Sequence, residues 1–470
     1  MSDMDRPSRP LPAVVSSAAA ALAVALALVL ATAGTASAVP EAGAQVAGTL
    51  PSREAGPGIG GSVQRLVPEP TIGGGTEDID RPLTLEALRD AILPAPTGDP
   101  FFDSVPPGTA GAAPGEVLAR RDVTAAAAPA AGAPIVRADQ FVVRSTEPDG
   151  DPTRATATLI HPAAPWTGQG PRPVLVNALP IDSLGTRCTP GYTLAHGIGL
   201  HTNVMDVVPP TTAVALAHGY AVLVPDHQGP EMAYADPVVA GHAILDAVRG
   251  MRAVAPELAG SRVGVTGYSG GAIAALGAAK LADAYAPDLA GTVTAVAIGG
   301  VPADFELLLD SMSGNAGVGL LTAAVFGLSR HNPQLLGLAN NLAWRMAVSP
   351  VKDQCTVPLA AMGGTLAPIE ALATGDDALT SPSAREFFAR SRMTDVPVTR
   401  PMLVYQGAQE FWVPTAGTRA LVAEQCAMGA TVDYREVPGE HVIAAGTGFG
   451  EAMAWLDSAL RGVPPASTCP

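Results

Sequence analysis

The chain has 470 residues, 48% of them hydrophobic and 15% charged, which suffices to bury one large core or two small ones. Its formal net charge of −16 excludes, as a first interpretation, a nucleic-acid-binding protein and a protein held on anionic lipid by a basic patch. The four cysteines are too few for a disulfide-built scaffold and include no CxxC pair, so a zinc ribbon or a thioredoxin-type site is not expected.

The N-terminus has the three parts of a secretory signal peptide. Arg6 and Arg9 give it a positive end, residues 18–31 are apolar, and a small-x-small sequence ends at Ala38. We therefore expect residues 1–38 to be a signal peptide cleaved after Ala38, with an uncleaved membrane anchor as the alternative. No later segment is apolar for long enough to span a bilayer, so the mature chain is expected to have no transmembrane segment. It is expected to be secreted, into a compartment in which disulfides persist.

Residues 39–96 are predicted to be a Gly/Pro-rich linker that is largely disordered. Glycine clusters at 57–61 and 73–75 interrupt this segment, and no apolar period is sustained along it. A short helix over residues 83–93 is the regular element expected there, and the folded body is expected to begin at about residue 97.

The body alternates short apolar segments with helical ones, which predicts an α/β fold. Residues 140–145 and 155–160 form an expected hairpin with its turn at 148–150. A helix is expected to begin at Asp236-Pro237, an N-cap followed by proline. This alternation predicts a mixed, mostly parallel sheet with helices on both faces. The further expected strands are residues 174–176, 220–224, 262–266, 292–298, 402–405 and 432–437.

Residues 301–395 interrupt the alternation with segments that are helical in composition. We expect them to form a helical lid or cap inserted into the core, whose two parts are then residues 97–300 and 396–470. A second ordinary domain is the alternative. The insertion holds apolar residues suited to acyl chains, although most are expected simply to pack the cap: Leu320, Leu321, Val325, Phe326 and Leu328.

The strongest local signal is the sequence Gly267-Tyr268-Ser269-Gly270-Gly271, between a predicted strand and a run of small helix-compatible residues. This is the GxSxG nucleophile elbow in its strand–turn–helix context. The glycines are needed because side chains on either side of the strained turn would clash. The serine then lies at a helix N-terminus, where the amide of Gly270 can donate to a developing oxyanion. A chance Gly-Ser turn is the alternative.

A nucleophilic serine needs a base. Position 272 is alanine, so a Ser-x-x-Lys mechanism is excluded and histidine is the remaining type. The order serine, acid, histidine leaves His331 and His441. His331 falls inside the helical insertion, whereas His441 follows the last predicted strand, so His441 is the predicted base.

The acid should follow the penultimate strand, and Glu410 is the acidic residue of the loop 407–414. Its role would be to hold the imidazole tautomer and stabilise the imidazolium. The alternatives are poorly placed: Asp395 precedes that strand, Asp433 lies within the next one, and Asp226 precedes the serine.

A second oxyanion donor is expected from the loop after the strand 174–176. Residues 177–183 follow that strand, and their backbone amides are the natural source. The residues alone do not say which amide is used.

The chain resembles the secretory lipase family from about Asp99 to Cys469. The resemblance rests on these segments: Asp99-Pro100-Phe101-Phe102; Asp182-Ser183 with Cys188-Thr189-Pro190-Gly191-Tyr192; Pro225-Asp226-His227-Gln228-Gly229; Gly241-His242-Ala243-Ile244-Leu245-Asp246; Gly267 to Ala272; and Gln425-Cys426-Ala427-Met428-Gly429-Ala430. Their combination is far more specific than the GxSxG motif alone.

The resemblance implies a secreted lipase or esterase with the α/β-hydrolase fold and a helical lid inserted after the serine. It implies a Ser269–His441–Glu410 triad and oxyanion amides at Asp182 and Gly270. It also implies disulfides Cys188–Cys355 and Cys426–Cys469. The family pattern has aspartate where this chain has Glu410, which is one methylene longer.

The predicted function is hydrolysis of carboxylic esters through an acyl-enzyme on Ser269, with no metal and no organic cofactor. The expected partner is a lipid or other acyl ester, including one at a lipid–water interface, and not nucleic acid. Two rivals remain: a serine peptidase or amidase on the same fold, and a non-catalytic lipid-binding surface protein. The oligomeric state does not follow from the sequence.

Overall fold

The computed structural model describes residues 54–72, 83–200, 202–206 and 210–470, which lie within one compact unit, Gln45–Pro470. The expected signal peptide and its cleavage site after Ala38 lie outside the described residues. Among the helices of the described ranges, none has both the length and the apolar composition that a membrane crossing requires.

A mixed sheet of nine strands organises the described chain, in the order β1-β2-β3-β5-β4-β6-β7-β8-β9. The strands β1, β2, β3 and β5 pair in antiparallel fashion, and the ladder from β5 through β4 to β9 is parallel. The strands are β1 (Val117–Asp122), β2 (Ile135–Thr146), β3 (Pro152–Pro162), β4 (Val174–Ala178), β5 (Ala221–Pro225), β6 (Val263–Tyr268), β7 (Val293–Gly299), β8 (Met402–Gly407) and β9 (Val432–Val437).

Every strand expected from the sequence is present, and β1 is an addition. Its sequence, Val-Leu-Ala-Arg-Arg-Asp, is only partly buried. Because β1 is an edge strand, it carries charged side chains that hide its apolar period.

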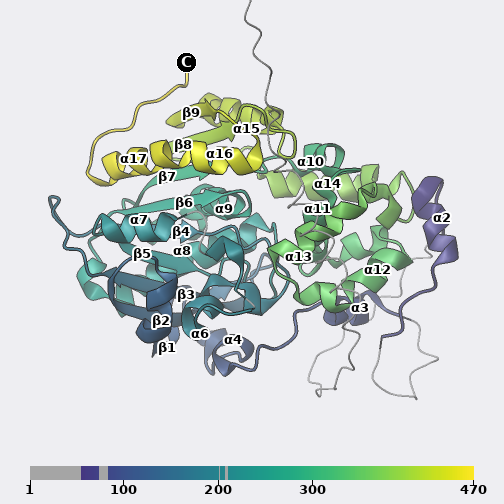
Figure 1. Cartoon of the computed structure of the whole chain (residues 1–470), viewed down its shortest axis with the longest axis horizontal. Coiled ribbons are helices and arrows are strands. Elements are labelled where there is room, and N and C mark those ends of the chain that lie inside the picture. The colour runs from purple at the N-terminus through teal and green to yellow at the C-terminus, as the bar shows by residue number, and fades with distance from the viewer. Residues whose placement is uncertain (1–53, 73–82, 201, 207–209) are drawn as a thin grey trace, which may run out of the picture. The chain divides into compact units, whose positions relative to one another are not determined.

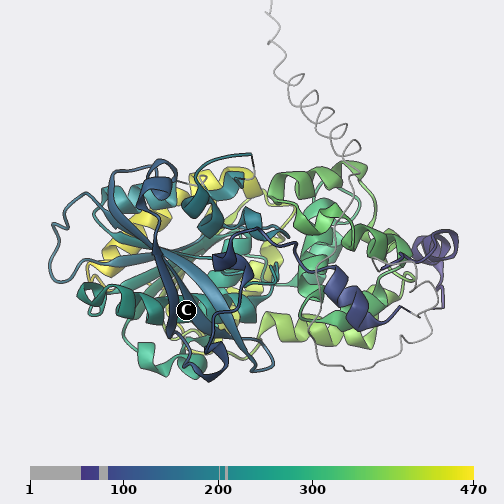
Figure 2. The same ribbon diagram turned by 90° about the horizontal axis from the view of Figure 1, so that it is seen from below.

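Helices cover both faces of the sheet (Figures 1 and 2). The α-helices are α2 (Gly58–Leu66), α3 (Leu85–Ala91), α4 (Pro100–Asp103), α5 (Thr124–Ala130), α6 (Pro190–His196), α7 (Thr211–Ala217), α8 (Pro237–Val254), α9 (Gly270–Tyr285), α10 (Phe305–Met312), α11 (Val318–Ser329), α12 (Asn341–Ala347), α13 (Thr356–Ala361), α14 (Pro382–Arg392), α15 (Thr415–Ala427), α16 (His441–Thr447) and α17 (Phe449–Leu460). On one face α8, α9 and α15 pack on the strands, and on the other α5, α6, α7, α16 and α17 do so.

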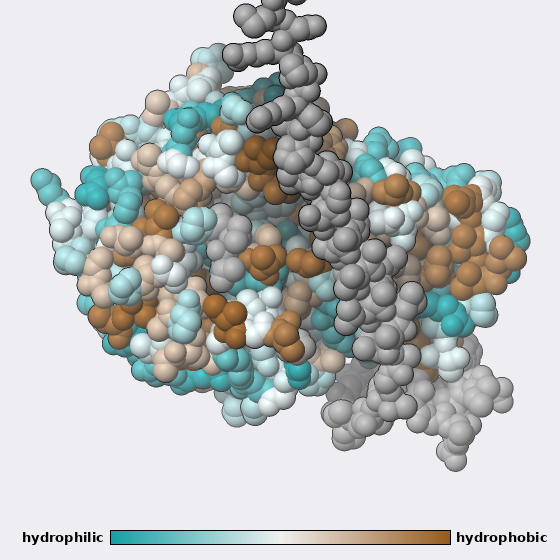
Figure 3. Space-filling model, in the orientation of Figure 1, coloured by the Kyte–Doolittle hydropathy of each residue, from teal (hydrophilic) through white to brown (hydrophobic). Residues whose placement is uncertain are grey.

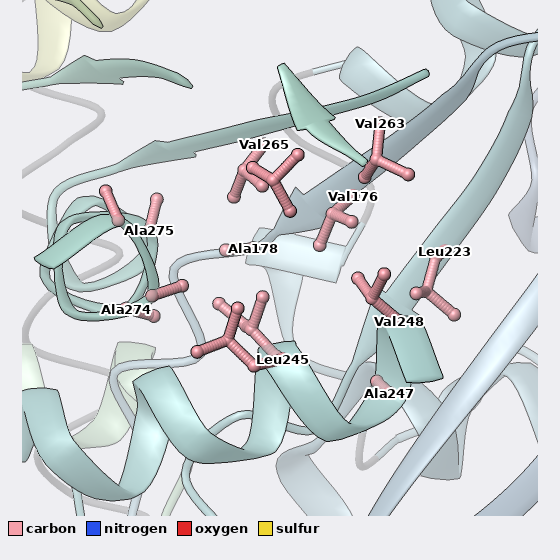
Figure 4. Close-up of a cluster of buried hydrophobic side chains, with 14 of the residues drawn as sticks. Val176, Ala178, Leu223, Leu245, Ala247, Val248, Val263, Val265, Ala274 and Ala275 are labelled. Atoms are coloured by element: carbon pink, nitrogen blue, oxygen red, sulfur yellow. The ribbon is translucent and has the colours of Figure 1, made fainter. Parts of the chain in front are cut away.

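Helix α8 begins where the sequence predicts. The Oδ1 atom of Asp236 accepts from the amides of Val238 (2.9 Å) and Val239 (3.1 Å), and Pro237 occupies the first turn. Its buried face meets the strands across a hydrophobic core, in which Leu245 and Val248 lie close to Val176 (Figure 4). This packing fixes the positions of the carboxyl ends of the parallel strands, which are followed by the loops that carry the candidate catalytic residues.

The residues between β7 and β8 form helices α10 to α14, whose apolar side chains share a cluster with Leu184, Tyr234 and Ile273 of the sheet domain. Two helices from the N-terminal side pack on the insertion: α3, which lies within the helix expected over residues 83–93, and α2, which differs from the expected disordered linker. Leu88 of α3 and Ile92 are fully buried in this cluster. The side-chain oxygen of Gln64 in α2 accepts from the amide of Asn341 at 2.8 Å. Helix α2 was not expected, because tertiary contacts supply most of the stability of so short a helix.

Candidate active site

The serine predicted as nucleophile sits at a strained turn between β6 and α9. Ser269 has φ 53° and ψ −121°, a region that non-glycine residues rarely adopt. A Cβ on Gly267 would lie 2.1 Å from the Gly271 carbonyl oxygen, and one on Gly271 would lie 2.0 Å from that of Ala178. Glycine is therefore required at both positions, for the steric reason that the motif predicts.

The turn brings Ser269 to His441, the first residue of α16. The Nε2 atom of His441 lies 2.9 Å from Ser269 Oγ, and its Nδ1 atom lies 2.8 Å from Glu410 Oε2. Glu410 follows β8 and His441 follows β9. Ser269, His441 and Glu410 thus form one hydrogen-bonded chain, although Ser269 lies 172 positions and Glu410 31 positions from His441 in the sequence. The side chain of Glu410 is fully shielded from solvent in this arrangement.

The extra methylene of Glu410 is taken up by its own loop. Its Oε1 atom accepts from the backbone amides of Phe411 (3.0 Å), Trp412 (2.9 Å) and Val413 (3.1 Å). Burial alone would raise the pKa of Glu410, but the hydrogen bonds from His441 and from these amides outweigh burial and hold its pKa below the usual value. An ionised acceptor therefore faces His441 Nδ1 and selects the tautomer that leaves Nε2 free to accept from Ser269.

Tyr268, the residue before the nucleophile, supports the histidine. Its hydroxyl donates to the backbone carbonyl of His441, and the two rings lie 5.2 Å apart between centroids. Gly300 allows this approach, because a Cβ there would lie 2.7 Å from the Tyr268 ring and 2.9 Å from the His441 ring.

The alternative base and acids have other partners. The ring nitrogens of His331 lie 3.2 Å from Glu147 Oε2 and 3.4 Å from Glu231 Oε2. Asp226 accepts from the amide of Gly191 at 2.7 Å, at the start of α6.

Two other carboxylates do not reach the histidine. Asp433 pairs with Arg435 at 2.7 Å. Asp395 lies in a turn with φ 64°, ahead of β8. The structure thus places Glu410, and none of these carboxylates, against His441 Nδ1.

The loop after β4 brings Asp182 to the nucleophile. Asp182 is buried and has φ 43°, and its Oδ1 atom lies 1.7 Å from where a Cβ on Gly270 would be. Among the described residues, the amides of Asp182 and Gly270 donate to no other residue. Two amides that bond no other residue thus lie beside the nucleophile, which is the requirement for an oxyanion hole, although the Asp182 amide also interacts with the carboxyl of its own side chain.

Side chains from elsewhere hold the carbonyls of this loop, residues 179–185, hereafter the oxyanion loop. His227 Nε2 donates to the Leu179 carbonyl at 2.8 Å. The Ile181 carbonyl accepts from Asn203 Nδ2 at 2.7 Å and from Thr356 Oγ1 at 2.8 Å. These three side chains were not singled out from the sequence, although His227 lies in a segment that carries the family resemblance.

Burial dominates the titration of the acidic groups behind the loop. It raises the pKa of Asp182 to about 7, although the nearby charge of His441 opposes the shift. Burial also raises the pKa of Asp226 to about 8, and it lowers the pKa of His227 to about 4, so this imidazole is neutral.

Within the described ranges, no group of three or more His, Cys, Asp or Glu side chains is arranged so that it could hold a metal ion.

The structure has two disulfides among the described residues, and they are the pairs that the family resemblance implies. Cys188–Cys355 joins the segment after the oxyanion loop to the insertion, across 167 residues. Cys426–Cys469 joins α15 to the C-terminal tail, across 43 residues.

A parallel-based mixed sheet, a serine elbow after β6, and an acid and a histidine after β8 and β9 define the α/β-hydrolase fold. The chain belongs to the secretory lipase family, whose sequence profile matches residues 197–468.

Relatives and solved structures agree with this assignment. The chain is 30% identical over 408 residues to a probable inactive lipase of Mycobacterium tuberculosis, covering 83% of this chain and 88% of that protein. It is 30% identical over 403 residues to a trichothecene C-3 esterase of Fusarium sporotrichioides, covering 79% and 85%. Candida antarctica lipase A in its closed state shares the fold, with a TM-score of 0.71 and 24% identity over 80% of this chain and 89% of that chain.

Proposed function

We propose that the protein is a secreted serine hydrolase of carboxylic esters that works through an acyl-enzyme. The observation that carries this proposal is the hydrogen-bonded chain Ser269–His441–Glu410 beside the amides of Asp182 and Gly270, which bond no other residue in the described part of the chain. The names of the relatives, which are lipases and esterases, support ester substrates.

In the proposed acylation, Ser269 Oγ bonds to the ester carbonyl carbon while its proton passes to His441 Nε2. The carbonyl oxygen becomes an oxyanion that accepts from the amides of Asp182 and Gly270. The tetrahedral intermediate then breaks its bond to the alkoxy oxygen, which takes the proton from His441 and leaves as the alcohol. Glu410 keeps its negative charge throughout and stabilises the imidazolium.

Deacylation repeats these steps with water as the nucleophile. Water loses a proton to His441 Nε2 as its oxygen attacks the acyl carbon, and the proton then returns to Ser269 Oγ as the carboxylic acid leaves. All of these transfers use side chains and amides of this chain.

Apolar side chains next to the triad suit a lipid or other hydrophobic ester. Phe411, Val442 and Ile443 adjoin Glu410 and His441 in sequence and are 55%, 65% and 55% exposed. Apolar residues also form separate groups among polar ones on the face drawn in Figure 3. The family, described as secretory, and the two disulfides support an extracellular location for the mature chain, with cleavage after Ala38.

The lead experiment measures hydrolysis of p-nitrophenyl esters from C2 to C16, together with labelling of Ser269 by a p-nitrophenyl phosphonate. Ser269→Ala and His441→Ala should each lower kcat by roughly 10⁵–10⁶-fold, whereas His331→Ala, outside the proposed triad, should stay within about twofold. A chain-length series is needed because relatives are named for different esters, including triacylglycerol and trichothecene esters.

A relative is named as a probable inactive lipase, so the non-catalytic rival has a specific observation behind it. Wild-type protein that neither turns over any ester nor reacts with the phosphonate would establish that rival. Rapid cleavage of anilides with negligible ester turnover would instead establish an amidase.

A further inference from the structure

A buried guanidinium joins the insertion to the oxyanion loop. Arg330 follows the last residue of α11, and only 1% of its surface is exposed. It donates to the backbone carbonyls of Ile92 (3.1 Å), Leu184 (2.9 Å), Glu231 (2.7 Å), Met232 (2.9 Å) and Lys352 (3.0 Å). Burial lowers the pKa of Arg330 to about 9, so the group stays charged at neutral pH.

These five acceptors belong to four segments that are far apart in the chain. They are the end of α3, the oxyanion loop, the connection between β5 and α8, and the turn before Cys355. A guanidinium presents its donors in one rigid plane, so a single side chain fixes the relative positions of all four segments.

The acceptor in the oxyanion loop lies two residues after the proposed oxyanion donor. Asp182 is held in the left-handed region, with φ 43°, so its amide direction depends on both flanks of the loop. His227 holds the N-terminal flank through the Leu179 carbonyl. On the C-terminal flank, the carbonyl of Leu184 accepts from Arg330, while the amide of Leu184 donates to Gln354 at 3.0 Å.

We propose that Arg330 is a positioning residue for the oxyanion hole: its bond to the Leu184 carbonyl holds the Asp182 amide toward Ser269. The inference rests on the proposed function, because the position of this amide matters to catalysis only if an oxyanion forms there. Arg330 itself acts on substrate only through the loop.

Asn340 provides a matched control within the same insertion. It is fully buried, and its Nδ2 atom donates to the carbonyls of Ala371 (2.7 Å) and Ala373 (2.9 Å). It is likewise a buried side chain that binds several carbonyls, but the described residues to which its side chain bonds lie outside the oxyanion loop. Loss of Asn340 should therefore report general weakening of the insertion.

The test compares Arg330→Met, Arg330→Lys and Asn340→Ala in the full mature chain. Arg330→Met should speed amide hydrogen exchange in residues 179–185 and lower kcat by about 10–100-fold, with KM within about threefold. The rate at which the p-nitrophenyl phosphonate labels Ser269 should fall by the same factor, because that reaction also places a negative oxygen in the oxyanion hole. The expected loss is smaller than the fall in kcat of about 10²–10³ that follows removal of a whole oxyanion donor. Arg330→Lys, with its charge kept and fewer donors, should fall between, and Asn340→Ala should keep kcat within about twofold.

Two results would overturn the inference: unchanged exchange in residues 179–185, or a loss of kcat in Asn340→Ala as large as in Arg330→Met. If Arg330→Met fails to fold, Arg330→Lys decides, and wild-type kcat and exchange in that variant would refute the role. A wild-type protein inert to the phosphonate would refute the proposed function instead, and the exchange data would still show whether Arg330 holds the loop.

Discussion

Glu410 shows how one residue can depart from the aspartate that the family pattern has and still meet the histidine. Its carboxylate spans two sets of donors, with Oε1 on the amides of residues 411–413 and Oε2 on His441. The longer side chain folds back along its own loop, where Oε1 binds the backbone amides, and Oε2 can then accept from His441 Nδ1. The loop and the side chain therefore form one unit.

We expect Glu410→Gln to lower kcat by about 10³–10⁴-fold, because a neutral amide does not stabilise the imidazolium. Glu410→Asp should cost about 10–100-fold, since a shorter side chain cannot reach both sets of donors. Steady-state kinetics with p-nitrophenyl butyrate measure both changes. Asp433→Asn is the control and should keep near-wild-type kcat, because Asp433 pairs with Arg435. Near-wild-type kcat in Glu410→Gln would show that Glu410 is not the acid of the triad.

Asp182 gives the activity a predictable pH dependence. Burial raises the pKa of Asp182 to about 7, and its carboxyl packs against Gly270, beside the proposed oxyanion site. Ionisation above that pH would place a negative charge near a developing negative charge. We therefore expect kcat to fall as pH rises through about 7, and Asp182→Asn to lose that descending limb. An identical limb in Asp182→Asn would contradict this assignment.

The same shift has a consequence for stability with a definite sign. The ordinary pKa of 3.8 applies to the unfolded chain, and the folded pKa is about 7, so between these values only the unfolded state releases the proton. Stability is therefore greatest below about pH 4 for this group and declines up to about pH 7. Asp226, with a pKa of about 8, acts in the same direction. Thermal unfolding of Asp182→Asn against wild type at pH 5 and pH 8 measures the difference.

At the scale of elements, the oxyanion loop is held from the insertion as well as from the sheet. Thr356, the first residue of α13, bonds the Ile181 carbonyl, and Cys355 beside it forms the disulfide with Cys188. A short loop with a strained residue at its centre gains its conformation from such external contacts. The loop and α13 should therefore behave as one element.

The two disulfides should separate stability from activity. Cys188→Ser/Cys355→Ser opens a link across 167 residues next to the oxyanion loop, and Cys426→Ser/Cys469→Ser opens one across 43 residues at the tail. Both should lower Tm, since bridges over long loops contribute up to about 4–5 kcal/mol. We expect the first pair to lower kcat about tenfold and the second to leave it within about twofold. Equal kcat in the two variants would show that the disulfide near the loop only stabilises the fold.

At the scale of the whole molecule, the N-terminal segment is part of the body. Arg345 of α12 donates to the carbonyls of Pro68 (2.7 Å) and Glu69 (2.9 Å), just after α2. The amide of Gly56 donates to the carbonyl of Thr374 at 3.0 Å. Residues 54–72 thus bind the insertion in the described part of the chain.

A mature chain shortened to begin at residue 73 should therefore have a less stable insertion. We expect Tm to fall by roughly 3–6 °C and proteolysis within residues 338–376 to be faster, while kcat for a short ester stays within about twofold. Arg345→Ala, which removes the contacts to Pro68 and Glu69, should reproduce part of the effect. Wild-type Tm in the shortened chain would show that these contacts contribute nothing to stability.

The sequence by itself determined the layered α/β sheet and the nucleophile. Short apolar segments with flanking glycines predict buried parallel strands. The glycines next to Ser269 meet the steric requirement of the nucleophile elbow, so adjacent residues predict the turn. Chain order selected His441 and Glu410, because the loops after successive parallel strands emerge at one edge of the sheet. These features depend on local pattern and topology, which a sequence carries directly.

Only the tertiary structure decided what holds the site in place. The partners of the oxyanion loop, His227, Asn203, Thr356 and Arg330, come from four separate segments, and each acts on a backbone carbonyl that any residue type would present. The docking of α2 and α3 on the insertion and the burial that raises the pKa of Asp182 were equally hidden. A contact between a side chain and a distant backbone leaves no periodicity in the sequence, so it becomes visible only once the chain is folded.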